Sequence, residues 1–408
     1  MTAQQITEIS VAPIPVWYRK ELGKNSRVDN IGLNRIEWLV RARTDGGSEG
    51  LTIANRFMRG FTSFHDTQGT VAGLLDLLGE VFLGRRTDEF LEAAEGKVTG
   101  VKPSAQRAFR RNGWMSILAF DLLGQEIGVS CIDLLGGRKR DRIDAYDTTL
   151  YFQDIAAPNR GAAQVAKDAR EAYDAGYRQM KIKVGRGGRW MLPKDGMRRD
   201  AEVVLAVRDA VGPDAKIMVD ANFGYDGHLD LLEEFVRETL SANVLWFEEM
   251  VTADLRAYRA FRDILSRAGS DAWLVCGEVD REPVSEVFRD LIAEGLIDGY
   301  QPDIVAHGFS RWQEIEGHLA STGVRSIPHN FGNGNFGTRA ALIFGAASET
   351  FVTLEDERHL PNVYADDEFM FGGGSYAIPS EPGPGLGLAV DEAEFQRSHA
   401  INELTITA

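Results

Sequence analysis

The chain has 408 residues, of which 44% are hydrophobic and 26% charged, the balance of an ordinary globular protein rather than of a disordered or fibrous one. Its 45 basic and 61 acidic side chains leave a formal net charge of −16, which repels nucleic acid and anionic membranes, so we expect neither as a partner. The apolar runs are too short to span a bilayer, and the first ten residues do not resemble a secretory signal. Two cysteines are too few for a disulfide framework, and we expect a cytoplasmic protein.

The first third of the chain predicts an α+β arrangement. Apolar residues alternate within 6–17 and 36–54, and Thr44-Asp45-Gly46-Gly47 is typical of a turn, so we expect a small antiparallel sheet. From 70 to 135 apolar residues recur at intervals of three and four, which indicates helices. We therefore expect a capping domain over residues 1–140.

After residue 140 short apolar strands alternate with amphipathic helices, and the fold class is α/β. Eight β/α units over roughly 220 residues match a (β/α)₈ TIM barrel in number and size. We expect this barrel over residues 141–370, followed by a C-terminal segment over 371–408 that begins rich in Gly and Pro. The expected strands are 145–150, 179–184, 216–220, 244–248, 273–278, 299–304, 324–329 and 351–355.

Three consecutive expected strands end in a carboxylate: Asp220, the pair Glu248-Glu249, and Glu278. The carboxyl ends of parallel barrel strands converge on one face, so these acids point to one place. An isolated Asp after a strand is more often a helix N-cap, but three such acids on consecutive strands would repel one another without a cation. Oxygen ligands of this kind suit Mg²⁺, with Mn²⁺ as a substitute.

The second expected strand carries Lys181-Ile182-Lys183, and the period of two places both ammonium groups on one face. A lone Lys-x-Lys is more often a solvated strand edge. Here the strand directly precedes the three strands that end in acids. Burial beside a bound cation would lower a lysine pKa, which would make a general base.

The sixth and seventh expected strands bring Asp303 and His329 to the same barrel face. A carboxylate that accepts the imidazole N–H fixes the tautomer and raises the basicity of the other nitrogen, so the pair could act as an acid/base dyad opposite the lysines. A lone histidine is more often structural. Glu355 ends the eighth strand, and it would donate a hydrogen bond to an enolate if protonated or otherwise form a salt bridge.

A glycine motif at residues 332–337 offers a different function. Gly332-Asn333-Gly334-Asn335-Phe336-Gly337 follows a strand, opens a helix and precedes Glu355 by about twenty residues, the pattern of an NAD-binding fingerprint. Under this hypothesis the protein would be an NAD-binding oxidoreductase. The hypothesis does not explain the three strands that end in acids or the Lys-x-Lys. The same glycines fit a barrel loop that approaches an anionic ligand.

These residues together resemble the enolase superfamily, and within it the mandelate racemase subgroup. The resemblance covers nearly the whole chain. It includes Asp121-Leu122-Leu123-Gly124, Leu134-Leu135-Gly136-Gly137, the Val-Asp-Ala-Asn around Asp220, the Trp-Phe-Glu-Glu around Glu248, and Gly385-Leu386-Gly387 with Asp391. The last of these is similar to the C-terminal return to the cap in that family. Met250 departs from the proline often found there, which leaves open the choice between Glu248 and Glu249 as a ligand.

The resemblance implies a role for each residue of the site. It implies that Asp220, Glu248 and Glu278 bind Mg²⁺ and that Lys183 is the base on one face of the substrate. Lys181, Asn222 and Glu355 would contact the substrate, with Glu355 hydrogen-bonded to the enolate oxygen. His329 and Asp303 would form the dyad on the other face.

The implied chemistry is removal of the α-proton from a hydroxylated carboxylate, a sugar acid, followed by loss of the β-hydroxyl as water to give a 2-keto-3-deoxy acid. The same residues would run a racemisation or epimerisation if His329 instead protonated the opposite face. We prefer an acid-sugar dehydratase, a hydro-lyase, by analogy with the subgroup. The preferred partner is thus a small-molecule sugar acid.

Specificity is expected in two cap loops, around Lys20–Asp29 and Phe57–Phe64, which we expect to close over the barrel mouth. Their basic and amide side chains suit a hydroxylated anion better than an aryl acid. We also expect a homo-oligomer.

Overall fold

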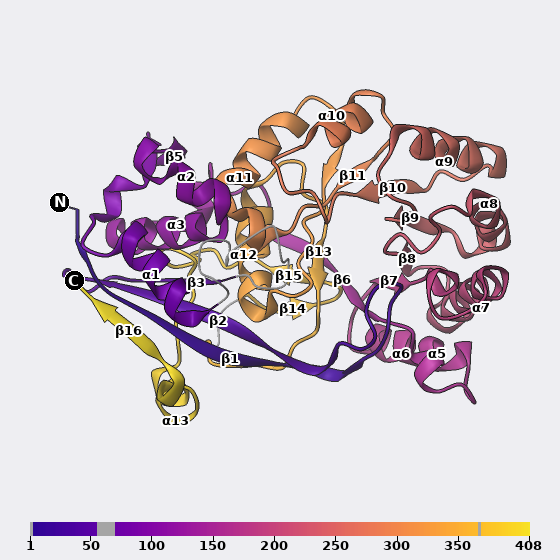
Figure 1. Cartoon of the computed structure of the whole chain (residues 1–408), viewed down its shortest axis with the longest axis horizontal. Helices are drawn as coiled ribbons and strands as arrows, with labels where there is room; N and C mark the ends of the chain where they lie inside the picture. The colour runs from indigo at the N-terminus through magenta and orange to yellow at the C-terminus, as the bar shows by residue number, and fades with distance from the viewer. Residues whose placement is uncertain (1–2, 55–69, 366–368) are drawn as a thin grey trace.

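A computed structural model describes residues 3–54, 70–365 and 369–408 of the chain. It has two parts, a cap built around an antiparallel sheet and a barrel of alternating strands and helices (Figure 1). Both ends of the chain lie on the cap side of the molecule in this view. Within the described ranges, no helix combines the length and the apolar character needed to cross a bilayer.

The cap sheet has the strand order β16-β1-β2-β3 and is antiparallel. β1 and β2 form a long hairpin that runs from the cap to the barrel, and the predicted turn at 44–47 joins β2 to β3 (Figure 1). The hairpin is longer than the period-two pattern predicts, because β1 continues beyond Trp17 through polar residues that reach the barrel mouth. The bounds are β1 Ile6–Leu22, β2 Gly32–Thr44, β3 Glu49–Ile53 and β16 Leu404–Thr407.

Helices of the cap cover one face of this sheet. α3 (Trp114–Ile127) is buried along most of its length because it packs between β3 and a barrel helix, α11 (Ile304–Leu319). α1 (Val71–Phe82) begins at Thr70, whose side chain accepts a hydrogen bond from the amide of Gly73. The other cap elements are β4 Leu91–Ala94, β5 Lys97–Val101, α2 Pro103–Arg111 and α4 Cys131–Leu134.

The barrel prediction is confirmed: in the described part of the chain, eight parallel strands follow one another in the order β6 to β13, and β13 closes the ring on β6. Several strands are shorter than predicted because the residues past their ends turn into the site as loops. The bounds are β6 Arg142–Leu150, β7 Gln179–Lys183, β8 Lys216–Asp220, β9 Val244–Glu248, β10 Trp273–Cys276, β11 Gly299–Tyr300, β12 Arg325–Ser326 and β13 Leu354–Asp356.

Amphipathic helices surround the barrel, as the sequence pattern predicts. α11 starts earlier than predicted and is interrupted at Gly308, whose φ of 63° breaks the helix. A Cβ at Gly308 would lie 1.9 Å from the carbonyl oxygen of Gly113, so only glycine allows the close contact between α11 and α3. The remaining helices are α5 Gln153–Ala156, α6 Ala162–Asp174, α7 Pro193–Val211, α8 Leu229–Glu238, α9 Leu255–Ala268, α10 Glu286–Ala293 and α12 Gly334–Ala347.

The C-terminal segment contacts both parts of the molecule. β14 (Phe371–Gly372) and β15 (Ser375–Ala377) extend the barrel sheet beside β6, whereas β16, which follows α13 (Glu392–Ser398), pairs with β1 of the cap. Leu386, which lies between β15 and β16 in the chain, donates its amide to the buried Asp121 of α3 at 2.8 Å. Asp121 also accepts from the amide of Leu51 at 2.7 Å. One carboxylate thus joins the returning chain to the cap.

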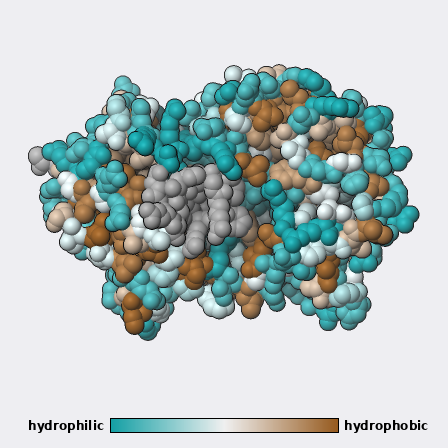
Figure 2. Space-filling view, in the orientation of Figure 1, coloured by the Kyte–Doolittle hydropathy of each residue, from teal (hydrophilic) through white to brown (hydrophobic). Residues whose placement is uncertain are grey.

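The surface agrees with the acidic, polar composition. Hydrophilic residues cover most of the visible rim of both parts, and apolar residues appear in small separate groups (Figure 2).

Loss of the Asp121 carboxylate should weaken the whole fold. In Asp121→Ala two buried amides lose their acceptor, and since each unsatisfied group costs about 1–3 kcal/mol, we expect the free energy of unfolding to fall by about 2–6 kcal/mol. Urea denaturation followed by circular dichroism measures this change. The control is Asp133→Ala, an exposed acid in the first turn of α4. Equal stability of the two variants would contradict the anchoring role.

Candidate active site

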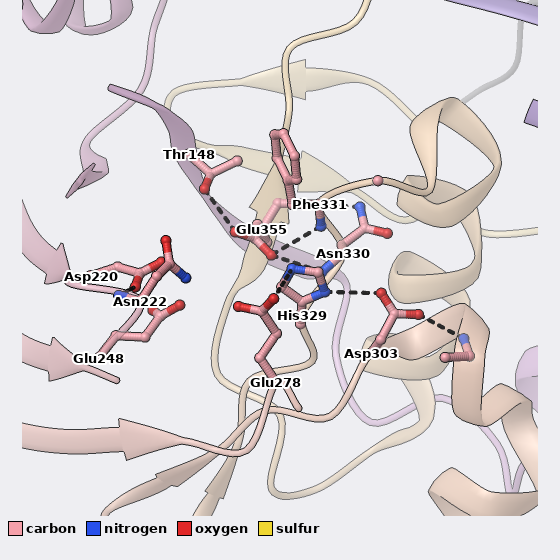
Figure 3. A network of polar contacts seen from close by, with 12 residues as sticks. Thr148, Asp220, Asn222, Glu248, Glu278, Asp303, His329, Asn330, Phe331 and Glu355 are labelled. Carbon is pink, nitrogen blue, oxygen red and sulfur yellow. Dashed lines mark hydrogen bonds and ion pairs between the residues drawn. The ribbon is translucent and has the colours of Figure 1, made fainter. Parts of the chain in front are cut away.

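The three predicted metal ligands meet at the carboxyl ends of the barrel strands (Figure 3). One carboxylate oxygen each of Asp220, Glu248 and Glu278 lies within 4.8 Å of the others. Asp220 and Glu248 are register partners at the last position of β8 and β9. Glu278 follows β10 after Gly277, whose φ of 114° turns the chain toward the other two.

The choice between Glu248 and Glu249 is resolved by backbone geometry. Glu248 ends β9 with its side chain in the acidic cluster, whereas Glu249 adopts a φ of 41° that places its side chain outside the cluster. Neither Glu249 carboxylate oxygen has a hydrogen-bond partner among the described residues. Burial, together with Glu278 and Asp220, raises the pKa of Glu249 well above its usual range.

Both lysines of β7 point into the site and are buried, with exposures of 1% for Lys181 and 6% for Lys183. Lys181 Nζ lies 2.6 Å from Glu248 Oε1 and 2.8 Å from Glu355 Oε1. Lys183 forms an ion pair with Asp220 and donates a hydrogen bond to Oδ1 of Asn222 at 3.1 Å. The shared face predicted from the spacing of two is therefore present.

The lowered lysine pKa was expected beside a bound cation and stays a prediction, but among the protein's own groups the balance at Lys181 runs the other way. Burial does lower the pKa of its ammonium group, but the carboxylates of Glu248 and Glu355 outweigh burial and hold the pKa well above its usual range. Lys181 is therefore a fixed cation, suited to binding an anion rather than to removing a proton.

The charges of the cluster fit a divalent cation. Burial is the main factor that raises the pKa of Glu248 to about 7; Lys181 opposes it, and the neighbouring Asp220 and Glu355 add to it. With its carboxylates ionised, the site holds five acids against three cations, a net charge of −2. The acids are Asp220, Glu248, Glu278, Asp303 and Glu355, and the cations are Lys181, Lys183 and the imidazolium of His329. An oxygen-rich site of this charge suits Mg²⁺.

The predicted dyad is present on the other side of the site (Figure 3). His329 Nδ1 lies 2.9 Å from Asp303 Oδ2, and His329 Nε2 lies 3.6 Å from Glu278 Oε1. Asp303 also caps α11, because its Oδ1 accepts a hydrogen bond from the amide of Ala306 at 2.6 Å. Burial lowers the pKa of His329, but Glu278, Glu355 and Asp303 outweigh burial and raise that pKa to about 10.

Glu355 lies between the lysines and the dyad, where it accepts hydrogen bonds. Besides the ion pair with Lys181, its oxygens accept from the Thr148 hydroxyl at 2.7 Å and from the amides of Asn330 at 2.7 Å and Phe331 at 3.1 Å. Burial raises the pKa of Glu355, yet Lys181 and His329 outweigh it and hold the pKa far below its usual range. In this arrangement Glu355 is a carboxylate; donation to an enolate requires that it first gain a proton.

The backbone amides of the glycine motif donate hydrogen bonds to a side chain of the protein. The amides of Gly332, Asn333 and Gly334 point at Oε1 of Glu357, at 2.7, 3.2 and 3.3 Å. A dinucleotide fingerprint needs such amides for a pyrophosphate, and here a buried carboxylate takes that place. Glu355, which the fingerprint would require to bind a ribose, lies in the barrel site instead. The geometry therefore disfavours the NAD-binding hypothesis.

One of the two predicted cap loops lies over the barrel mouth. Ser26 Oγ lies 3.0 Å from the carbonyl oxygens of Val184 and Gly185, directly after Lys183, and Trp190 Nε1 donates to the carbonyl of Asn25 at 2.7 Å. This confirms the closure expected for 20–29. The second loop, 57–64, lies outside the described residues.

Sequence reasoning missed the buried charges that hold the site loops. Arg186, fully buried, contacts Asp154 and Asp200 and donates to the carbonyl oxygen of Lys183 at 3.2 Å. Glu357 was missed as well. In the sequence, Glu357 lies two residues after the strand-end acid Glu355, and Arg186 lies three residues after Lys183. Both patterns are too common to be recognised without the contacts.

The fold and the site together define a capped (β/α)₈ barrel with an acidic, lysine-containing mouth. The family model described as "Enolase C-terminal domain-like" matches residues 164–394, more than half of the chain. The chain belongs to this family, within the mandelate racemase group of the enolase superfamily, which confirms the resemblance and the fold class.

Two of the similar proteins are named for a sugar acid or a sugar-acid lactone. D-galactarolactone cycloisomerase of Agrobacterium fabrum is 32% identical over 238 residues, covering 57% of this chain and 56% of that protein. D-gluconate dehydratase of Thermoproteus tenax is 27% identical over 291 residues, covering 69% of this chain and 54% of that protein. The matched region therefore spans little more than half the length of either relative.

Among solved structures, galacturonate dehydratase from Geobacillus sp., complexed with D-galacturonate and 5-keto-4-deoxy-D-galacturonate, has a TM-score of 0.80 and 26% identity. The match covers 98% of this chain and 99% of that one. A mutant of the same enzyme, complexed with Mg, also has a TM-score of 0.80, at 25% identity over 99% and 97% of the two chains.

Removal of one acid should weaken metal binding without unfolding the protein. In Glu278→Gln the amide replaces an anionic ligand, so we expect the Kd for Mg²⁺, measured by isothermal titration calorimetry, to rise about 10-fold or more. Glu282→Gln is the control, since Glu282 lies on the same loop with its side chain 71% exposed. An unchanged Kd in Glu278→Gln would refute the metal site.

Proposed function

We propose that this protein is a Mg²⁺-dependent sugar-acid dehydratase that converts a hydroxylated carboxylate into a 2-keto-3-deoxy acid. The single observation that carries the proposal is that Lys183 and the His329–Asp303 dyad contact different members of one acidic cluster, Lys183 at Asp220 and His329 at Glu278. The sugar-acid dehydratases among the similar proteins support the same reaction class.

Asp220, Glu248 and Glu278 would hold the cation, with Mn²⁺ as a substitute for Mg²⁺. When bound, the metal supplies positive charge beside the carboxylate of the substrate, which lowers the cost of the enolate. Lys181 adds a second, fixed positive charge next to it. Because Lys181 is buried among anions, it holds its position before the reaction begins, which is the condition for effective electrostatic stabilisation.

Lys183 is the proposed base. Once its ammonium group has given up a proton to solvent, the free amine accepts the proton from the α-carbon, and the electrons of the broken C–H bond pass to the enolate. Asn222 fixes the Lys183 side chain through the 3.1 Å hydrogen bond. Asn222 is also a proposed contact for the substrate.

His329 is the proposed acid. The carboxylates of Glu278, Glu355 and Asp303 raise its pKa, which favours the protonated imidazolium that an acid requires. It gives that proton to the β-hydroxyl, which leaves as water while the enolate electrons form the Cα–Cβ double bond. Asp303 keeps the imidazole in the orientation that directs Nε2 toward the site. The resulting enol tautomerises to the 2-keto acid.

A second candidate function, racemisation or epimerisation of a 2-hydroxy acid, rests on the same opposed groups. If no leaving group stands at the β-carbon, His329 returns its proton to the α-carbon on the face opposite Lys183, and the configuration inverts. The two functions therefore differ in the substrate rather than in the residues.

The experiment that separates these functions is a screen of mono- and diacid sugars with Mg²⁺. Keto acid is read as semicarbazone absorbance, and proton NMR in D₂O reports exchange at the α-carbon. Keto acid from one or a few stereoisomers is the expected result. Deuterium uptake with inversion but without keto acid would establish the epimerase instead, and silence in both measurements would overturn the proposal.

Replacement of the base should abolish turnover but not metal binding. In Lys183→Ala we expect the rate of α-proton exchange to fall by at least about 10³-fold. General base catalysis contributes about 10²–10⁴-fold, and the activation barrier for a carbon acid this weak is high. NMR in D₂O measures the exchange, and calorimetry checks Mg²⁺ binding. Lys216→Ala, an exposed lysine at the start of β8, is the control. Retained exchange in Lys183→Ala would refute its role.

A further inference from the structure

Glu357 is a buried acid outside the predicted site, at the junction of cap and barrel. One of its oxygens accepts from the three amides of 332–334 described above. The other contacts the Tyr18 hydroxyl at 3.0 Å, His359 Nε2 at 3.3 Å and the guanidinium of Arg35, an ion pair with the cap strand β2. Burial alone would raise the pKa of Glu357, but Arg35 and His359 outweigh it and lower that pKa to about 2, so the group is ionised.

The loop that Glu357 holds also carries the partners of the dyad. Asn333 Nδ2 donates to Asp303 Oδ2 at 2.7 Å, the same oxygen that His329 Nδ1 contacts. The amides of Asn330 and Phe331, one and two residues after His329, donate to Glu355 (Figure 3). Residues 329–334 therefore connect the Glu357 cluster with His329, Asp303 and Glu355 within six residues.

Cap side chains reinforce this loop from the other side. The Arg35 guanidinium lies 4.9 Å from the centre of the Phe331 ring and 5.3 Å from that of Tyr18. The loop itself needs glycine: Gly334 has a φ of 62°, and a Cβ there would lie 1.3 Å from Oε1 of Glu37. The cap and the loop after β12 are therefore closely packed around one charge.

We propose that Glu357 is a positioning residue for the acid side of the site, so that Arg35 and Tyr18 of the cap set the orientation of His329 and Asp303 through the 329–334 loop. This rests on the proposed function. The base side is held separately, because Lys183 lies on β7 and its loop is fixed by Arg186 with Asp154 and Asp200.

The consequence is a selective defect. When the loop shifts, His329 no longer meets the leaving hydroxyl, whereas Lys183 and the three metal ligands keep their places. A misplacement of about 1 Å costs roughly 10²-fold in rate when the group must be aligned with the reacting atom. Loss of water should therefore slow far more than removal of the α-proton by Lys183.

The test uses Glu357→Gln, with Asp356→Asn as the matched control. Asp356 is the neighbouring buried acid, but its side chain contacts the hydroxyls of Tyr177 at 2.7 Å and Tyr376 at 2.8 Å, away from the dyad. Both variants lose one buried charge. In Glu357→Gln we expect kcat for keto acid formation to fall about 100-fold, with KM within about threefold of the wild type. The ratio of α-deuterium uptake to keto acid should rise about 10-fold or more, and Asp356→Asn should change neither quantity more than about threefold.

A readout that does not depend on activity is hydrogen–deuterium exchange of the free protein by mass spectrometry. Peptides that contain 330–336 should exchange at least about 10-fold faster in Glu357→Gln, with no such change in Asp356→Asn. Unchanged exchange there would overturn the proposal even if the wild type turned over no acid. An inactive wild type with faster exchange in the variant would instead count against the dehydratase function alone.

A second variant covers the case in which Glu357→Gln does not fold, since that change leaves Arg35 without its carboxylate partner. Asn333→Ala keeps Glu357 and its cap partners and removes the hydrogen bond from the Asn333 side chain to Asp303. We expect unchanged amide exchange at 330–336, unchanged Mg²⁺ affinity and a fall in kcat of about 10-fold or more with the same rise in the deuterium-to-keto acid ratio. Wild-type kcat in Asn333→Ala, or equal loss of both reactions in Glu357→Gln, would contradict the proposal.

Discussion

Mutual repulsion among carboxylates at the mouth of the barrel is the constraint on which the rest of the site depends. Parallel strands bring one carboxylate oxygen each of Asp220, Glu248 and Glu278 within 4.8 Å of the others, with Asp220 and Glu248 buried and Glu278 partly buried, so water screens them little. Such a cluster persists only when positive charge is supplied at fixed positions. Lys181 and Lys183 supply part of it, and the remaining charge of −2 defines what the site can bind. The catalytic arrangement thus follows from the way these charges are compensated.

Buried charged side chains outside the cluster hold loops in place and do not take part in the proposed reaction. Arg186 with its two aspartates holds the loop after β7, and Glu357 with Arg35 holds the loop after β12. A loop at a barrel mouth has few apolar contacts, so ordered backbone must come from hydrogen bonds. A buried carboxylate that accepts three amides does this without filling the cavity that a substrate needs. The two sides of the site are therefore ordered by separate groups of residues.

The regular parts of this molecule could be predicted from the sequence. Once the strands are parallel, an acid at a strand end lies at the barrel mouth, and the two lysines of a Lys-x-Lys lie on one face. The eight-stranded barrel, the acidic triad and the His329–Asp303 contact follow from strand order alone. The lengths of the short strands β11 and β12 did not follow, since their ends depend on loop hydrogen bonds. The balance of charge around Lys181 could not be predicted from the sequence either. It depends on two carboxylates, Glu248 and Glu355, whose distance from the ammonium group no pattern reports.

The closing of the cap sheet by the last strand has a consequence for the order of assembly. β16 pairs with β1, so strands formed by residues 404–407 and 6–22 become neighbours only when nearly the whole described chain has been synthesised. Until then one edge of β1 has open backbone groups. Because domains tend to fold as they leave the ribosome, the barrel strands can pair before this edge is covered. The cap sheet, rather than the barrel, would then be the last sheet of the molecule to receive all its strands.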